Sequence, residues 1–280
     1  MNIAFKLDSV AEIHPIRTDW FFLSRNATKE IKYFVTAAFH LVGDLDCWDS
    51  KEFLLWVCHC QTLSNVWTIC HRADWMLMVV EQSLRLGIIE LGNRELFRQF
   101  ACSCVKAACA ECGINASSVV LSAAESHSRG AITKDELFRV QKRMGGGATG
   151  AGVCGLPKWD PVAALQLGSW HTADSSPLLA ALRASHFAAR AAEFKAAQEG
   201  AAGSDLEERV RGTWKEYYVP KLFGEEHPEV PKRAGYHARL HSAEILRKTV
   251  PNPFLSVNSS RLGLLACSLE QFLASEATHT

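Results

Sequence analysis

Residues 93–144 read NRELFRQFACSCVKAACAECGINASSVVLSAAESHSRGAITKDELFRVQKRM, and start and stop signals divide this stretch into consecutive helices. Asn93 is a suitable N-cap residue, and Gly113 stands where a left-handed residue ends a helix. The apolar positions between them recur at helical spacing: Phe97, Phe100, Ala101, Cys104, Val105, Ala108 and Cys112. This pattern predicts a first helix with one buried face.

Two more helices are expected in the same stretch. Asn115 or Ser117 is predicted to begin the second helix, and Gly130 to end it. Thr133 and Glu136 have the spacing of a capping box, in which the threonine hydroxyl accepts from the amide three residues on and the glutamate reaches back. The sequence therefore predicts an antiparallel helical hairpin with a third helix appended.

Much of the remaining chain also has helical periodicity, so we expect an all-α fold, either an irregular multi-helix bundle or stacked helical hairpins. An alanine-rich helix is predicted at residues 177–200, where small side chains permit close helix packing. Other helices are expected at residues 28–43, 50–63, 67–86, 205–218, 235–249 and 260–275. Turns are predicted at residues that break helices: Pro220, Gly224, Pro228 and Pro231.

A glycine-rich segment, GGGATGAGVCGLP at residues 145–157, is predicted to be a flexible linker. It would separate an N-terminal helical region, residues 1–144, from a C-terminal Ala-rich helical region, residues 158–280. The glycines also match G-x-G-x-x-G, which in nucleotide-binding proteins follows a strand and opens a helix. Here a predicted helix precedes the motif and no β-α-β unit is visible, so nucleotide binding is not expected.

Composition and charge restrict the class of protein. The 280 residues are 48% hydrophobic, which is ordinary for a globular chain with a sizeable core. Thirty basic residues balance thirty acidic ones, so no overall field attracts nucleic acid. No apolar run reaches the ~18 residues needed to span a bilayer, and the N-terminus lacks the apolar core of a secretory signal. We therefore expect a cytoplasmic protein that binds neither nucleic acid nor membrane.

Ten cysteines are present, eight of them between residues 47 and 112. In a cytoplasmic chain reduced cysteines serve as small buried residues, and this is their predicted role. The alternative is a zinc site, for which two sets of residues are candidates: Cys58, His59, Cys60, Cys70 and His71, or Cys102, Cys104, Cys109 and Cys112. The second set contains C-x-x-C spacing, but within a helical pattern that lacks knuckle glycines.

A further set of candidate metal ligands is His237, His241 and Glu244. In the helix expected at residues 235–249 these side chains share one face, where two imidazoles and a carboxylate can hold zinc or iron. The histidine spacing matches H-E-x-x-H, but Ala238 stands where the general-base glutamate is required. The alternative interpretation is an exposed polar helix face.

Two segments, ELFRQFACSCVKAACAECG and SSVVLSAAESHSRGAITKDELFRVQ, resemble the helical repeat of uncharacterised bacterial proteins common in planctomycetes. Those proteins carry a Leu-Phe-Ala-Cys-x-Cys-type helix, a Thr-x-x-Glu-Leu cap, an alanine-rich helix and an Asn-Pro-Phe closing motif. HSAEILRKTVPNPF resembles that motif, with Pro251 in place of the usual glycine. The helix order is also similar to that of immunity proteins of bacterial polymorphic toxin systems. The resemblance covers residues 90–257 and implies an all-α scaffold that binds another protein.

No catalytic arrangement is predicted. The chain has no G-x-S-x-G nucleophile elbow, and Glu125 and His127 are too close in sequence to face each other on a helix. Eight tryptophans offer anchors for an interface. We therefore expect a non-enzymatic module that binds another protein without a cofactor, as a toxin-neutralising or defence-associated accessory protein. The alternative is a metal-binding hydrolase or regulator that uses zinc.

Overall fold

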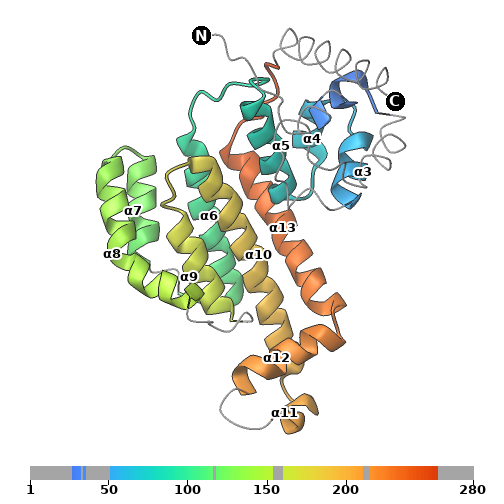
Figure 1. Cartoon of the computed structure of the whole chain (residues 1–280), viewed down its shortest axis with the longest axis vertical. Coiled ribbons are helices and arrows are strands. Elements are labelled where there is room, and N and C mark those ends of the chain that lie inside the picture. Colours follow the sequence, from blue (N-terminus) through green and yellow to red (C-terminus); the bar gives the residue numbers. More distant parts are fainter. Residues whose placement is uncertain are drawn as a thin grey trace, which may run out of the picture. The chain divides into compact units, whose positions relative to one another are not determined.

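The computed structural model describes residues 27–32, 34–35, 51–115, 118–153, 160–210 and 215–257. In these ranges the chain forms eleven α-helices, α3 to α13, and no β-strand (Figure 1). The prediction of an all-α multi-helix fold is confirmed. The chain divides into two compact units: unit 1 is Met1–Val66 with Asn258–Thr280, and unit 2 is Trp67–Val257.

Unit 1 contains α3 (Lys51–His59) and the first half of α4 (Leu63–Ile69). Residues 29–32, 34 and 35 are helical, as predicted, and the rest of the helix expected at residues 28–43 lies outside the described ranges. The Glu30 carboxylate accepts a hydrogen bond from the Leu63 amide at 2.7 Å. It thereby satisfies one of the amides that the first turn of α4 leaves without an intrahelical partner.

The single helix expected at residues 67–86 is interrupted in the structure. α4 ends at Ile69, and α5 (Ala73–Arg85) begins only after Cys70, His71 and Arg72. The carbonyl oxygen of Cys70 accepts a hydrogen bond from Nη1 of Arg247 at 2.6 Å. A distant arginine thus satisfies a backbone carbonyl at the break between the two helices. The sequence pattern around residue 70 does not reveal this break.

The core of unit 2 is organised around α10 (Pro177–Ala201), which contacts α5, α6 (Glu95–Cys112), α9 (Pro161–His171), α12 (Lys215–Glu226) and α13 (Glu229–Thr249). In Figure 1, α10 lies between α6 and α13. Most of its buried positions are alanine: Ala180, Ala181, Ala184, Ala188, Ala189, Ala191, Ala197 and Ala201. Small side chains let neighbouring helices approach closely, as the sequence predicted.

The described part of residues 93–144 folds much as predicted. α6 ends at Cys112, and its C-cap residue is Gly113. The φ of Gly113 is 68°, in the left-handed region that glycine adopts readily. α7 (Val119–Ser128) follows, and Gly130 beyond it also has a positive φ of 76°. The cap of α7 differs from the prediction, because the Ser118 hydroxyl accepts from the Leu121 amide at 3.4 Å. The helix therefore begins later than Asn115 or Ser117 indicated.

The predicted capping box is present at the start of α8 (Lys134–Val153). The Thr133 hydroxyl accepts from the Glu136 amide at 3.2 Å, and Oε2 of Glu136 accepts from the Thr133 amide at 2.7 Å. The Thr133 hydroxyl also donates to Oε2 of Glu136 at 2.9 Å, and the bonds that the Thr133 amide and hydroxyl donate to this carboxylate hold the pKa of Glu136 below its ordinary value of 4.5. The box therefore contributes stability above that value, and the contribution is lost as the pH falls through the lower pKa of the folded state.

We expect Thr133→Ala to lower the thermal midpoint at neutral pH, because the Glu136 amide in the first turn of α8 loses its side-chain partner. The difference from wild type should shrink as the solution is acidified below about pH 4.5, because a protonated Glu136 no longer supports the box. Circular dichroism melts across this pH range measure both effects. Thr133→Ser keeps the hydroxyl and serves as the matched control; an equal loss for serine and alanine would contradict the assignment.

The glycine-rich segment differs from the predicted linker, because α8 continues through residues 145–153 to Val153. Residues 154–159 lie outside the described ranges. Glycine weakens a helix by about 1 kcal/mol relative to alanine but does not forbid helical angles. The boundary between the two units also lies elsewhere, since residues on both sides of the segment belong to unit 2.

Of the four residues predicted to break helices, only Pro228 lies at a turn, where it separates α12 from α13. Pro220 and Gly224 lie inside α12, Pro228 is the N-cap residue of α13, and Pro231 lies in its first turn. Proline is tolerated in a first turn because its missing amide would have had no intrahelical partner there.

The helix expected at residues 205–218 is divided between α11 (Leu206–Arg209) and the start of α12. The helix expected at residues 260–275 lies outside the described ranges.

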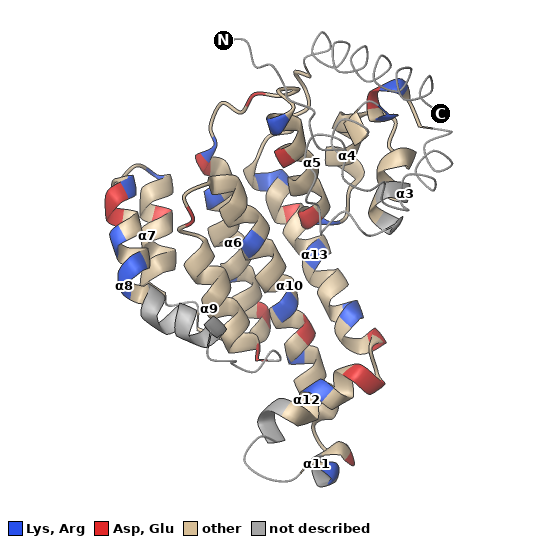
Figure 2. Ribbon diagram, viewed as in Figure 1, with Lys and Arg blue, Asp and Glu red and all other residues tan. Residues whose placement is uncertain are grey.

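Acidic and basic residues occur on the same helices of unit 2, as Figure 2 shows for α8, α10 and α13. Neighbouring opposite charges form ion pairs along these helices, such as Arg190 with Glu193 at 2.6 Å on α10. Within the ranges that the structure describes, no helix has the length and apolar character needed to cross a bilayer.

Candidate functional site

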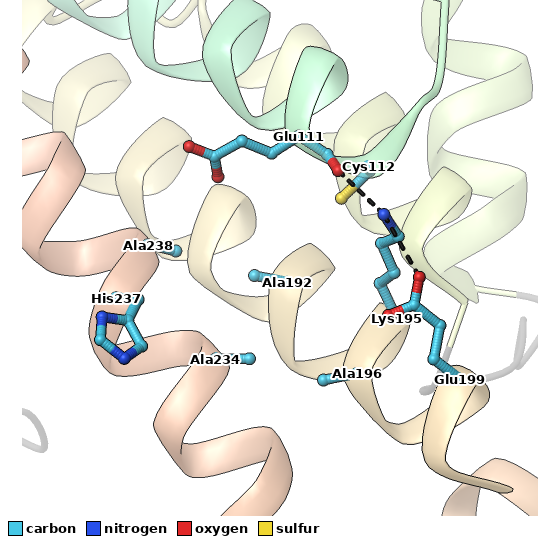
Figure 3. A pocket seen from close by; sticks show the side chains of 9 residues that line it. All are labelled: Glu111, Cys112, Ala192, Lys195, Ala196, Glu199, Ala234, His237 and Ala238. Atoms are coloured by element: carbon cyan, nitrogen blue, oxygen red, sulfur yellow. Dashed lines mark hydrogen bonds and ion pairs between the residues drawn. The ribbon is translucent and has the colours of Figure 1, made fainter.

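An open groove of about 300 Å³ lies on unit 2, where the last turn of α6 meets α10 and α13 (Figure 3). Its lining residues come from these three helices: Glu111, Cys112, Ala192, Lys195, Ala196, Glu199, Ala234, His237 and Ala238. Two of them, Cys112 and His237, belong to two different metal sites among those proposed from the sequence. The fold therefore brings members of both sets to one surface.

Alanine forms the floor of the groove. Ala192 and Ala196 are one turn apart on α10, and Ala234 and Ala238 are one turn apart on α13, so each pair faces the same side of its helix. α6 packs against both helices and stops at Gly113, whereas α10 and α13 continue. The groove is the part of the α10 and α13 surface that α6 leaves uncovered.

Lys195 and Glu199 form a polar edge along α10. Nζ of Lys195 donates to the main-chain oxygen of Glu111 at 2.9 Å and forms an ion pair with Glu199 at 3.3 Å (Figure 3). The last carbonyl groups of a helix carry partial negative charge and lack intrahelical donors, so an ammonium group there stabilises the helix end. Lys195 therefore secures the end of α6 against α10.

The Glu111 carboxylate extends from α6 toward α13 (Figure 3). Its Oε1 lies 2.5 Å from Nδ1 of His241, which is one helical turn beyond His237. The side chains of Glu111 and His241 are 46% and 44% exposed, so solutes can reach both. This contact joins α6 to α13 at the rim of the groove.

The remaining cysteines of the proposed zinc set lie in the interior. Cys102, Cys104 and Cys109 are buried, and the Cys104 sulfur lies 3.2 Å from the Ser242 hydroxyl. Burial raises the pKa of Cys102 and of Cys104 to about 12. A metal site requires thiolates, which these environments disfavour. These side chains act as the small packing residues predicted from the sequence.

The structure brings together neither the set of Cys102, Cys104, Cys109 and Cys112 nor the set of His237, His241 and Glu244. Cys112 lies at the groove while the other cysteines of its set are buried, and His241 turns to Glu111 whereas Glu244 is an exposed residue that does not line the groove. Among the described residues, no three histidine, cysteine, aspartate or glutamate side chains are placed to hold one metal ion.

Sequence reasoning missed Glu111 and Lys195. Glu111 is a single acidic residue at a helix end, and Lys195 is a single lysine in an alanine-rich helix, so neither belongs to a motif. Their partners lie 130 and 84 positions away in the chain. Only the packing of α6 against α10 and α13 reveals that they share a surface.

A second polar cluster joins α8, α9 and α10. Nδ1 of His171 lies 3.0 Å from Oδ2 of Asp174, and Arg183 donates to the same oxygen at 3.0 Å. Gln141 donates to the other carboxylate oxygen at 3.4 Å, and Phe187 stacks on the imidazole with ring centroids 5.4 Å apart. Because three groups share one buried carboxylate, we interpret this cluster as a connection between helices rather than as a catalytic acid and base.

No protein-family model, curated protein or solved structure matches the chain. The resemblance to planctomycete helical proteins and to immunity proteins therefore stays a prediction.

The different exposure of the four thiols predicts the order in which they are alkylated. Cys112 is half-buried at the groove, whereas Cys102, Cys104 and Cys109 are buried. We expect iodoacetamide to modify Cys112 before these three in the folded protein, although burial raises the pKa of Cys112 as well. Peptide mass spectrometry after timed quenching measures the order. Denatured protein, in which all four thiols should react at similar rates, is the control. Equal rates for Cys104 and Cys112 in the folded protein would contradict the packing.

Proposed function

We propose that the chain is a non-enzymatic protein-interaction module whose groove binds an α-helix of a partner protein. The observation that carries this proposal is the alanine floor of α10 and α13, which continues past the end of α6. α6 is itself a helix packed on the same pair of helices. A second helix placed in line with α6 would therefore meet a surface of the kind that already accepts one.

The shape of the floor defines the contacting face of the partner. Alanine side chains leave room for the close approach of a helix, and close approach favours small residues on the opposing face. The face that α6 presents to this interior is rich in such residues, including Cys104, Ala108 and Cys109. We expect the partner helix to carry alanine, serine or glycine at positions three and four residues apart.

The charges at the rim of the groove favour a basic residue beside the contacting face of the partner helix. Glu111 and Glu199 contribute two carboxylates, while Lys195 contributes one ammonium group that is already paired with Glu199. A lysine or arginine beside the small residues would pair with Glu111, and rim charges of this kind direct association and orientation more than they add affinity. The negative end of the α6 dipole favours the same basic group. The partner is thus a helix with a small apolar face and a basic flank.

A toxin-neutralising or defence-associated role belongs to this proposal. The resemblance to immunity proteins supports it, because such proteins act by binding another protein and need no catalytic group of their own. In that role the bound helix would belong to a toxin domain.

Selection from a phage-displayed library of helical peptides with randomised surface positions tests the proposal. We expect the selected peptides to share small residues at helical spacing and a neighbouring lysine or arginine. Their affinity should fall at least about tenfold for Ala196→Arg, because the long side chain fills the floor. Ala131→Arg, at an exposed position on the loop between α7 and α8, is the matched control and should leave binding unchanged. Selected peptides that bind the Ala196→Arg protein as well as wild type would refute the assignment of the groove.

A further inference from the structure

The chain itself contains a helix with the properties that the groove selects. α8 continues through residues 145–153, GGGATGAGV, in which five residues are glycine and two are alanine. Arg143 precedes this segment, and helical spacing places Arg143, Gly146 and Gly150 on one side of α8. Small residues at this spacing, beside a basic residue, are what the alanine floor and the acidic rim favour.

We propose that the groove binds α8 of a second copy of this chain. This inference rests on the proposed function, since it names the helix that occupies the same groove. Gly146 and Gly150 would lie against the alanine floor. Two helix axes approach to about 8 Å only where the side chains at the contact are small, and glycine against alanine meets that condition.

The charges of α8 and of the rim are complementary. Lys142 and Arg143 are exposed, and within the described part of the chain neither forms an ion pair. Arg139 lies four residues before Arg143, so like charges are neighbours along α8. Glu111 and Glu199 are exposed acids of the groove. A second copy thus brings basic side chains to a rim that carries carboxylates, and such pairs fix orientation more than they add affinity.

Arg143 is the residue that we assign to Glu111. His241 contacts Oε1 of Glu111, and the carboxylate has a second oxygen that can accept from a guanidinium group. The main-chain carbonyl groups at the end of α6 carry partial negative charge and favour the same cation. Arg143 would therefore meet the end of α6 while the glycines after it cover the floor.

The length of the segment fits the floor. A helix rises about 1.5 Å per residue, so residues 145–153 extend over about 13 Å. The two alanines that α10 contributes, and the two that α13 contributes, are four residues apart, or about 6 Å. Glycine also weakens a helix by about 1 kcal/mol per residue relative to alanine, so this segment gains more from packing than an ordinary helix does.

The helix in the groove belongs to a second copy because α8 packs elsewhere in its own chain. There α8 contacts α7 and α9, whereas the groove lies on α6, α10 and α13. Two copies that exchange α8 reciprocally would close as a dimer. One helix against a short floor buries less area than a standard interface, so the association is weak and depends on concentration. A helix that binds more tightly would displace the second copy.

Sedimentation velocity on the full, reduced chain tests the proposal at concentrations from about 5 to about 500 μM. We expect the weight-average mass to rise from 30.9 kDa toward twice that value. Ala196→Arg fills the floor and should keep the protein at the monomer mass. Arg143→Glu should do the same, because it sets two carboxylates against each other. Arg129→Glu, at the exposed C-cap residue of α7, is the matched control and should associate like wild type.

A charge exchange tests the assigned pair. Glu111→Lys alone should stay monomeric, because it sets two cations against each other. Mixed with Arg143→Glu it should associate, because the groove of one variant and α8 of the other again carry opposite charges. Circular dichroism establishes that both variants are folded. A mixture of the two folded variants that stays monomeric would overturn the pairing of Arg143 with Glu111.

The two proposals about the groove can fail separately. A wild-type protein that stays at the monomer mass up to the highest concentration would overturn the second copy as the occupant. Library peptides whose binding depends on Ala196 would still support the proposed function in that case. Self-association that Ala196→Arg does not weaken would place the contact outside the groove and would also overturn the inference.

Discussion

Arg98→Ala is expected to destabilise the protein by about 3–5 kcal/mol. Arg98 is 1% exposed and is the largest fully buried side chain in the described ranges. Its Nε donates to Oε2 of Glu95 at 2.8 Å, and its Nη1 donates to the main-chain oxygen of Thr172 at 2.5 Å. Alanine would leave a cavity and an unpaired buried carbonyl at the end of α9. Urea unfolding monitored by circular dichroism measures the loss.

Arg98→Met separates the two causes of that loss. Methionine fills much of the volume but cannot donate to Thr172, so we expect a smaller loss of about 1–3 kcal/mol. Arg94→Ala, at the exposed N-cap residue of α6, is the control and should change stability by less than about 0.5 kcal/mol. If Arg98→Ala behaved like Arg94→Ala, the buried arginine would not be the connection between α6 and α9 that the structure shows.

Gly235→Ala is expected to destabilise the protein by about 2 kcal/mol, although alanine is normally better than glycine in a helix by about 1 kcal/mol. A Cβ atom at residue 235 would lie 2.3 Å from Oε1 of Glu193. Glu193 is 8% exposed and accepts from Arg190 at 2.6 Å and from Arg239 at 3.0 Å. The carboxylate must move away and weaken both charge-assisted bonds, since the flexible side chain is the part that can yield.

A double-mutant cycle with Glu193→Ala tests this reason. If the added methyl group acts by displacing the carboxylate, Gly235→Ala should cost little once the carboxylate is absent, and the two single effects should not add. Gly92→Ala is the control for a glycine-to-alanine change without a steric contact, because an added Cβ atom at residue 92 has no neighbour within 4 Å. Additive losses in the cycle would mean that Gly235 acts through something other than Glu193.

Gly235→Ala and Glu193→Ala both probe the packing of α10 against α13, which creates the groove. Glu193 ties α10 to α13 through Arg239, and Gly235 allows that approach. The same pair of helices supplies the alanine floor, while α6 ends at Gly113 and leaves it uncovered. The groove exists because three helices of different extent share one core.

Local signals in the sequence were enough for much of the secondary structure. The cap at Thr133 and the ends of helices at Gly113 and Gly130 follow from hydrogen-bonding geometry and backbone angles that depend on neighbouring residues. The alanine-rich helix was also predictable, because its composition favours both helix formation and close packing. The function and the resemblance stay predictions.

Where the sequence misled, tertiary context prevailed over local preference. Glycine and proline are weak helix formers, yet residues 145–153 and Pro220 are helical. Conversely, the chain breaks at Cys70, where a distant Arg247 satisfies the carbonyl. At Cys70 the preference of a few residues for continued helix is small compared with the energy of packing and hydrogen bonding across the unit.

The sequence by itself determined that this protein is helical, where several of its helices start and stop, and that its cysteines suit a packed interior. Only the tertiary structure decided that Glu111 meets His241, that Cys112 and His237 line one groove, and that Glu244 lies outside it. The physical reason is distance along the chain. Helix formation depends on residues within about one turn, whereas a site depends on which helix faces pack together across the whole unit.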